Sequence, residues 1–100
     1  MLHSTFPYIA VLKLPSGEEL IGKIVSKTMT EYVVNKPLVL VNTQQGVQFA
    51  PLMLMADQAS DIILRNVCAE ATPVKQLETD YQSAVSGIAL PPSAGSFMGA

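Results

Sequence analysis

The stretch "LPSGEELIGKIVS", Leu14 to Ser26, decides the fold prediction. A Pro-Ser-Gly turn joins two apolar runs, and Gly22 interrupts the second run. Glycine inside a strand packs nothing and weakens the pairing, so it marks a bulge or a bend where another backbone comes close. Gly22 shares a face with Leu20 and Ile24, so we expect the bend to lie on the inner side of a strongly curved sheet.

Further strand-like runs extend this pattern to about residue 74. Proline cannot donate to a ladder, so Pro37 and Pro51 predict an edge or a bulge in each arm of a hairpin. A hinge at Arg65-Asn66 separates the last two short strands. The predicted strands are Tyr8–Leu14 and 19–26, the hairpin arms 31–41 and 47–56, and the segments 62–64 and 67–74.

Beyond residue 73 the apolar period changes to three or four, which predicts a helix. Thr72 suits its N-cap, Pro73 its first position and Gly87 its C-terminal cap. We divide the chain into an N-terminal arm (1–7), a β-barrel (8–74), a C-terminal helix (75–88) and a flexible tail (89–100). The apolar positions of the helix are Val74, Leu77, Tyr81, Ala84 and Ile88.

The composition predicts self-association. Of the 100 residues 49% are hydrophobic and only 14% are charged, against about 25% charged in ordinary soluble domains. A domain this short leaves much of its apolar surface exposed as a monomer, and exposed apolar patches usually mark interfaces. The net charge of −2 argues against broad electrostatic capture of nucleic acid, although symmetry could concentrate the six basic residues.

The compartment expected from the sequence is the cytoplasm. No apolar run approaches the roughly 20 residues that cross a bilayer, so we expect no membrane partner. The first residues, "MLHSTFPYIA", lack the basic and apolar regions of a signal peptide. The single Cys68 excludes an internal disulfide and fits a reducing environment.

Residues for catalysis are scarce, so we predict no enzyme, no cofactor and no metal site. His3 is the only histidine and lies near the terminus, and Cys68 is interpreted as a small buried hydrophobe. Glu18 and Glu19 are typical of a solvated charge pair beside a turn. The segment "SGEELIGK" lacks the Gly-Lys-Ser/Thr that opens a phosphate-binding helix.

The order of these segments resembles the Sm-like (LSm, Hfq-like) family. Its first motif has a glycine after strand one, a second glycine five residues on and an apolar residue two later, which Gly17, Gly22 and Ile24 match. Its second motif, an apolar strand ending in Ile-Arg-Gly, resembles "IILRN" at Ile62–Asn66. The resemblance implies a strongly bent five-stranded Sm-like (SH3-like) barrel, here with a hairpin extension and a C-terminal helix in place of the usual N-terminal one.

The resemblance also implies a homo-oligomeric ring of about five to seven subunits that binds single-stranded RNA, or DNA, at its pore. Taken whole, the chain is similar to small Sm-like proteins attributed to cyanophages, which implies a phage protein acting in a host cytoplasm. The family binds bases through the loop between strands two and three and through the Arg-Gly turn. Laid on this sequence, the nucleic-acid-binding residues are Lys27, Thr30, Tyr32, Arg65 and Asn66.

Two interpretations stay open for these residues. In the first, Tyr32 stacks on a base and Arg65 contacts phosphate or a base plane. In the second, Tyr32 is a half-buried strand aromatic and Arg65 forms an ion pair between subunits. The protein would then be a structural or adaptor module of a phage that uses the barrel for protein contacts. Met53 and Met55 are likewise interpreted either as core filler or as part of a subunit interface.

Overall fold

A computed structural model of the chain describes residues 5–86. The predicted class, a mostly β fold with one C-terminal helix, is confirmed. His3, Gly87, Ile88 and the tail 89–100 lie outside the described residues. The elements are β1 (Tyr8–Lys13), β2 (Glu19–Lys27), β3 (Glu31–Thr43), β4 (Gly46–Pro51), β5 (Asp61–Arg65), β6 (Ala69–Ala71) and α1 (Lys75–Ser86).

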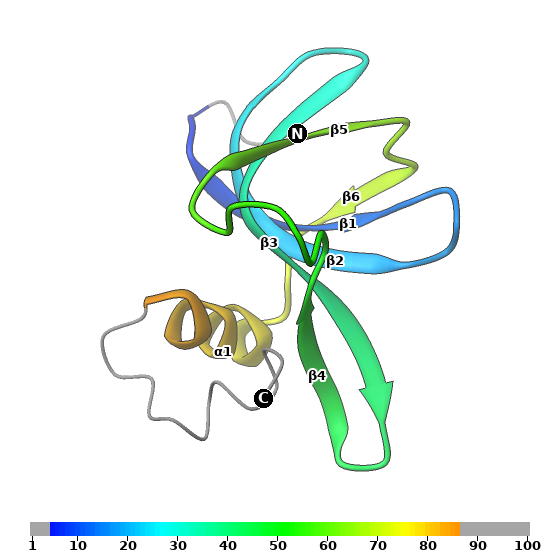
Figure 1. Cartoon of the computed structure of the whole chain (residues 1–100), viewed down its shortest axis with the longest axis vertical. Coiled ribbons are helices and arrows are strands. Elements are labelled where there is room, and N and C mark those ends of the chain that lie inside the picture. The colour runs from blue at the N-terminus through cyan, green and yellow to red at the C-terminus, as the bar shows by residue number, and fades with distance from the viewer. Residues whose placement is uncertain (1–4, 87–100) are drawn as a thin grey trace.

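The six strands form one antiparallel sheet whose order is β4-β3-β2-β1-β6, with β5 paired to β3 outside this path. The first half of β3 pairs with β5, and its second half pairs with β4 as a projecting hairpin (Figure 1). β5 and β6 follow each other in the chain but pair with β3 and β1, respectively. Among residues 5–86 no ladder joins β5 to β6, so the curved sheet stays open between them.

Gly22 lies at a close approach of β2 to β3. A Cβ atom at this position would overlap the Val34 side chain and would lie 3.3 Å from the Cα atom of Pro37. The pairing of β2 with β3 is irregular at this point, and two residues of β3, Lys36 and Pro37, stand opposite the single Gly22. This is the two-against-one arrangement of a β-bulge, which bends a strand and increases its twist. The bend expected from the sequence is therefore present.

Of the two alternatives that the sequence offers at Pro37, an edge or a bulge, the structure has the bulge, and Pro37 does not end its strand. β3 runs through Pro37 because the bulge removes the need for a ladder hydrogen bond there, and Lys36 takes up a positive φ of 53°. Pro51, in contrast, is the last residue of β4. Residues 52–60 form bends and turns.

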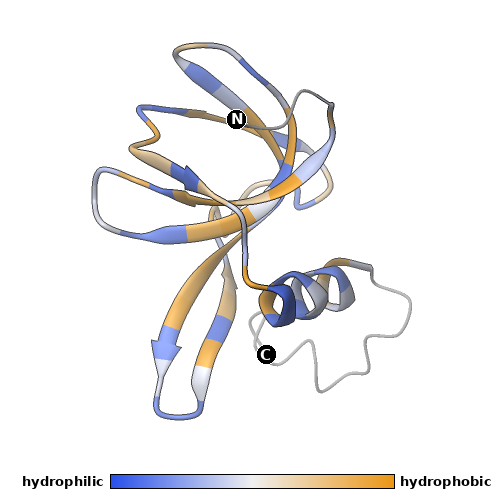
Figure 2. Ribbon diagram, turned by 180° about the vertical axis from the view of Figure 1, so that it is seen from behind, coloured by the Kyte–Doolittle hydropathy of each residue, from blue (hydrophilic) through white to orange (hydrophobic). Residues whose placement is uncertain are grey.

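Apolar residues alternate with polar ones along the strands (Figure 2), and buried apolar clusters lie on both faces of the curved sheet. The inner core lies inside the curve and consists of Tyr8, Ala10, Leu12, Leu20, Ile24 and Val34, all buried. The outer core lies between the sheet and α1 and consists of Ile21, Leu38, Tyr81 and Ala84. The Tyr81 hydroxyl also donates to the Lys36 carbonyl at 2.7 Å, which fixes α1 against the bulge.

Two predictions about single positions are wrong. α1 begins at Lys75, because the Val74 carbonyl accepts the first helical hydrogen bond from Glu78 at 3.0 Å, so Thr72 and Pro73 precede the cap. Cys68 is exposed, since it lies in the short connection between β5 and β6. For Met53 and Met55 the sequence left two interpretations open, and their exposure excludes core filler within residues 5–86.

Candidate nucleic-acid interface

The candidate residues fall into two groups on opposite faces of the sheet. Lys27 lies directly across from Tyr32 in the β2–β3 pairing, so their side chains share a face. Tyr32 pairs with Leu64 in β5, and both pack against the inner core. Arg65 pairs with Glu31, and these two are the next residues along β5 and β3 from Leu64 and Tyr32. Successive side chains of a strand point to opposite faces, so Arg65 points to the other face. The structure brings Lys27 and Tyr32 together and separates them from Arg65.

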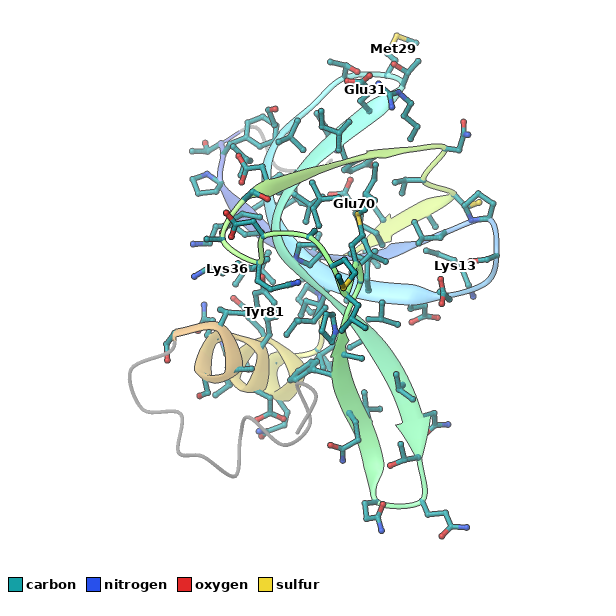
Figure 3. All side chains as sticks on the ribbon, in the orientation of Figure 1. Lys13, Met29, Glu31, Lys36, Glu70 and Tyr81 are labelled. Carbon is teal, nitrogen blue, oxygen red and sulfur yellow. The ribbon has the colours of Figure 1, made fainter. Side chains whose placement is uncertain are left out.

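The first group surrounds Glu70, whose side chain is only 6% exposed (Figure 3). The Lys27 ammonium lies 2.8 Å from Glu70 Oε1, and the Tyr32 hydroxyl donates to the same oxygen at 2.7 Å. The Tyr8 hydroxyl donates to Oε2 at 2.7 Å. Each of the three donors comes from a different strand, β1, β2 or β3. The Glu70 cluster, defined as these four residues, therefore ties β6 to three other strands.

The pKa values of the Glu70 cluster shift in the directions that keep the ion pair charged. Burial opposes ionisation of Glu70, but the hydrogen bonds from Lys27, Tyr8 and Tyr32 outweigh it and lower the pKa of this carboxyl. The hydrogen bond to Glu70 raises the pKa of Lys27. Burial, together with the same carboxylate, raises the pKa of Tyr32 to about 12. At neutral pH the cluster is one ammonium, one carboxylate and two neutral phenols.

Aromatic rings enclose the ammonium of this cluster. Lys27 Nζ lies 5.4 Å from the centre of the Tyr32 ring and 5.9 Å from that of Tyr8, within the range of cation–π attraction. Its side chain is 20% exposed. Tyr32 is thus a partly buried strand aromatic, which agrees with the second of the two interpretations of this residue. Lys27 is held beside it by the same carboxylate.

The second group is exposed and lies at the end of β5. The Arg65 side chain is 65% exposed, and its guanidinium contacts Glu31 Oε2 through Nη2 at 2.9 Å and Nε at 3.1 Å. The ion pair of Arg65 with Glu31 lies within one chain. Asn66 follows with a φ of 63°, in the left-handed region that glycine and asparagine tolerate best.

Thr30 lies in the exposed loop between β2 and β3. The Thr28 hydroxyl accepts hydrogen bonds from the backbone N–H groups of Thr30 and Glu31, at 3.2 and 3.1 Å, and so orders this turn. Met29 at its tip is fully exposed (Figure 3). The ordered turn holds Glu31, and through it Arg65, at the edge of the loop.

Sequence reasoning missed the residue that organises the first group. Glu70 lies between two alanines in a three-residue strand, and nothing in "AEA" marks it as the partner of a lysine 43 positions earlier. Tyr8 was interpreted only as a strand residue of the inner face. The signal that could have pointed to Glu70 is an acidic residue alone in a short apolar strand, where a buried charge needs a partner.

Within residues 5–86 no group of three or more His, Cys, Asp or Glu side chains could hold a metal ion. The same part of the chain contains no helix with the length and apolarity that a membrane crossing requires. No family model matches the chain, and no curated protein matches it significantly.

Proposed function

We propose that the chain is a non-catalytic, Sm-like β module that assembles into a ring and binds single-stranded RNA at the ring opening, with DNA as the possible substitute ligand. The observation that carries the proposal is the left-handed φ of Asn66 immediately after Arg65. Asparagine here takes the backbone conformation for which glycine is best suited, at the position where the Sm-like motif has Arg-Gly. The replacement of the motif's glycine by Asn66 therefore changes the residue type but keeps the backbone conformation.

The strand arrangement supports the same proposal. Five strands in the order β6-β1-β2-β3-β5 curve around the inner core, and the bend coincides with Gly22. The resemblance implies a strongly bent five-stranded barrel, and this curved sheet has its five strands but stays open between β5 and β6. The β3–β4 hairpin and α1 are additions outside this five-stranded unit (Figure 1).

Self-assembly is supported by open strand edges and exposed apolar side chains. In the described part of the chain β5 pairs with β3 alone, and β6 with β1 alone, so each leaves one edge available to another strand. Ile63 of β5 is 53% exposed. Addition of a strand across subunits would satisfy an open edge and cover such side chains, and repetition of one such contact closes a ring.

Nucleic-acid contact is proposed for the exposed group, with Arg65 as the phosphate or base contact and Asn66 and Thr30 beside it. The Arg65 side chain is 65% exposed although one carboxylate faces it. A ring would repeat this arginine, with its partner Glu31, around one opening, where nucleic-acid phosphate would compete with Glu31 for the guanidinium. The Glu70 cluster, which includes Lys27 and Tyr32, would hold the loop between β2 and β3 in place from the other face.

A second candidate function, a structural or adaptor module without nucleic acid, is favoured by the engagement of Lys27 and Tyr32 with Glu70. Native mass spectrometry of the full chain, with and without a short U-rich RNA, separates the two. The proposal predicts a discrete ring and a further species heavier by one RNA. A discrete ring that takes up no RNA supports the adaptor, and a monomer at high protein concentration contradicts both.

A further inference from the structure

A groove of about 700 Å³ lies on the outer side of the fold, between the β3–β4 hairpin and the first turns of α1. The turn between β1 and β2 borders one part of it. Its volume falls in the range of ligand sites. None of the candidate nucleic-acid-binding residues lines it.

The floor of the groove is apolar and incompletely covered. Leu40, Phe49 and Leu77 line it while they pack against the outer core. Val47 on the hairpin and Val74 before α1 line it as well, and they are 55% and 70% exposed. Exposure of these apolar side chains to water is unfavourable. An occupant whose own apolar side chains covered them would gain the free energy of burying that surface.

The rim of the groove is acidic. Glu18 comes from the turn between β1 and β2, Glu19 is the first residue of β2, and Asp80 comes from α1. Lys13 lies 3.5 Å from Glu19 and offsets part of this charge, but no lysine or arginine lines the groove itself. The carboxylates belong to two different elements, so a ligand lying on the apolar floor would meet negative charge from both.

We propose that this groove binds a short apolar peptide segment that carries lysine or arginine, supplied by a partner protein. Apolar side chains would cover Val47 and Val74, and the basic groups would pair with Glu18 and Asp80. Residues 87–100 of this chain contain no basic residue, so they cannot satisfy the acidic rim. Nucleic acid is repelled by the same carboxylates, which makes this surface independent of the proposed RNA site.

The test uses the full chain and two short labelled peptides, one alternating leucine with lysine and one alternating leucine with glutamate, in fluorescence anisotropy. The proposal predicts that the lysine peptide binds and the glutamate peptide does not. The double variant Glu18→Lys/Asp80→Lys should weaken binding about tenfold or more, since each reversal replaces an attraction by a repulsion. Glu78→Lys, on α1 but outside the groove lining, should leave binding unchanged.

Three results would overturn the proposal. Equal binding of both peptides would show apolar adsorption without charge recognition. Equal weakening by Glu78→Lys would show a general charge effect on the whole surface. A change in the oligomer's mass in Glu18→Lys/Asp80→Lys, measured by sedimentation, would identify a second copy of the chain as the occupant. None of these readouts involves RNA, so failure here is distinct from failure of the proposed function.

Discussion

Lys27 and Glu70 form an ion pair with 2.8 Å between ammonium and carboxylate, across two strands that share no ladder. Lys27 ends β2, and Glu70 is the central residue of β6. The β-sheet hydrogen bonds connect these strands only through β1. The Glu70 cluster therefore holds the curved sheet together at a place where backbone pairing does not.

Removal of the Glu70 carboxylate should destabilise the fold. Glu70→Ala leaves a mostly buried ammonium and two phenols without their acceptor, and we expect the free energy of unfolding to fall by about 2–4 kcal/mol. Urea denaturation followed by circular dichroism measures the change. Glu19→Ala is the matched control, because its pair with Lys13 is about half exposed and should contribute less than about 1 kcal/mol. Equal losses in the two variants would contradict a structural role for the cluster.

The same carboxylate should make stability depend on acid pH. The folded-state pKa of Glu70 lies below its ordinary value of 4.5, so its contribution is complete above pH 4.5 and is lost as pH falls through the folded pKa. Thermal denaturation between about pH 7 and pH 3 should show a smaller decrease of Tm in Glu70→Gln than in the wild type. A Glu19→Gln control should keep the wild-type slope. Parallel curves for Glu70→Gln and wild type would refute the assignment.

Gly22 should tolerate no side chain. A methyl group at this position would overlap the Val34 side chain and approach the Pro37 backbone. We expect Gly22→Ala to lower the free energy of unfolding by about 1–3 kcal/mol, as overpacking does elsewhere. The neighbouring exposed Lys23 supplies the control, and Lys23→Ala should change stability by about 0.5 kcal/mol or less. A Gly22→Ala protein as stable as the wild type would mean that the bend has another cause.

Asn66 should accept glycine but not a β-branched residue. Its φ of 63° suits Gly at no steric cost, whereas Val at this φ is strained. Asn66→Gly should keep wild-type stability within about 0.5 kcal/mol, and Asn66→Val should cost about 1–3 kcal/mol. Chemical denaturation of both variants measures this difference. If Val were as stable as Gly, the positive φ would not be a property of the protein in solution.

The local elements of this fold could be predicted from the sequence because they depend on short-range patterns. Alternation of apolar residues locates β1 and β2, and Gly22 predicts the bend that the bulge opposite Pro37 produces. The helix start was predicted too early, since Thr72 is a good capping residue by type but the first helical hydrogen bond is accepted by Val74. The capping preference of Thr72 alone does not determine the residue at which the helix begins.

The candidate site was predictable only in part, because its organisation depends on long-range pairing. Strand register decides that Tyr32 faces the inner core and Arg65 the opposite side, and no spacing in the sequence contains that information. The partner of Lys27 lies 43 positions away. The Arg65–Glu31 pair likewise joins residues that only the β3–β5 register makes neighbours.

The central proposal, RNA binding at Arg65, is tested most directly by fluorescence anisotropy of the full chain with a labelled U-rich RNA across a salt series. We expect binding that weakens as salt rises and that falls about tenfold or more in Arg65→Gln. Lys75→Gln, an exposed basic residue at the start of α1, should bind as the wild type does. Absence of binding by the wild type at low salt, or equal loss in both variants, would contradict the account.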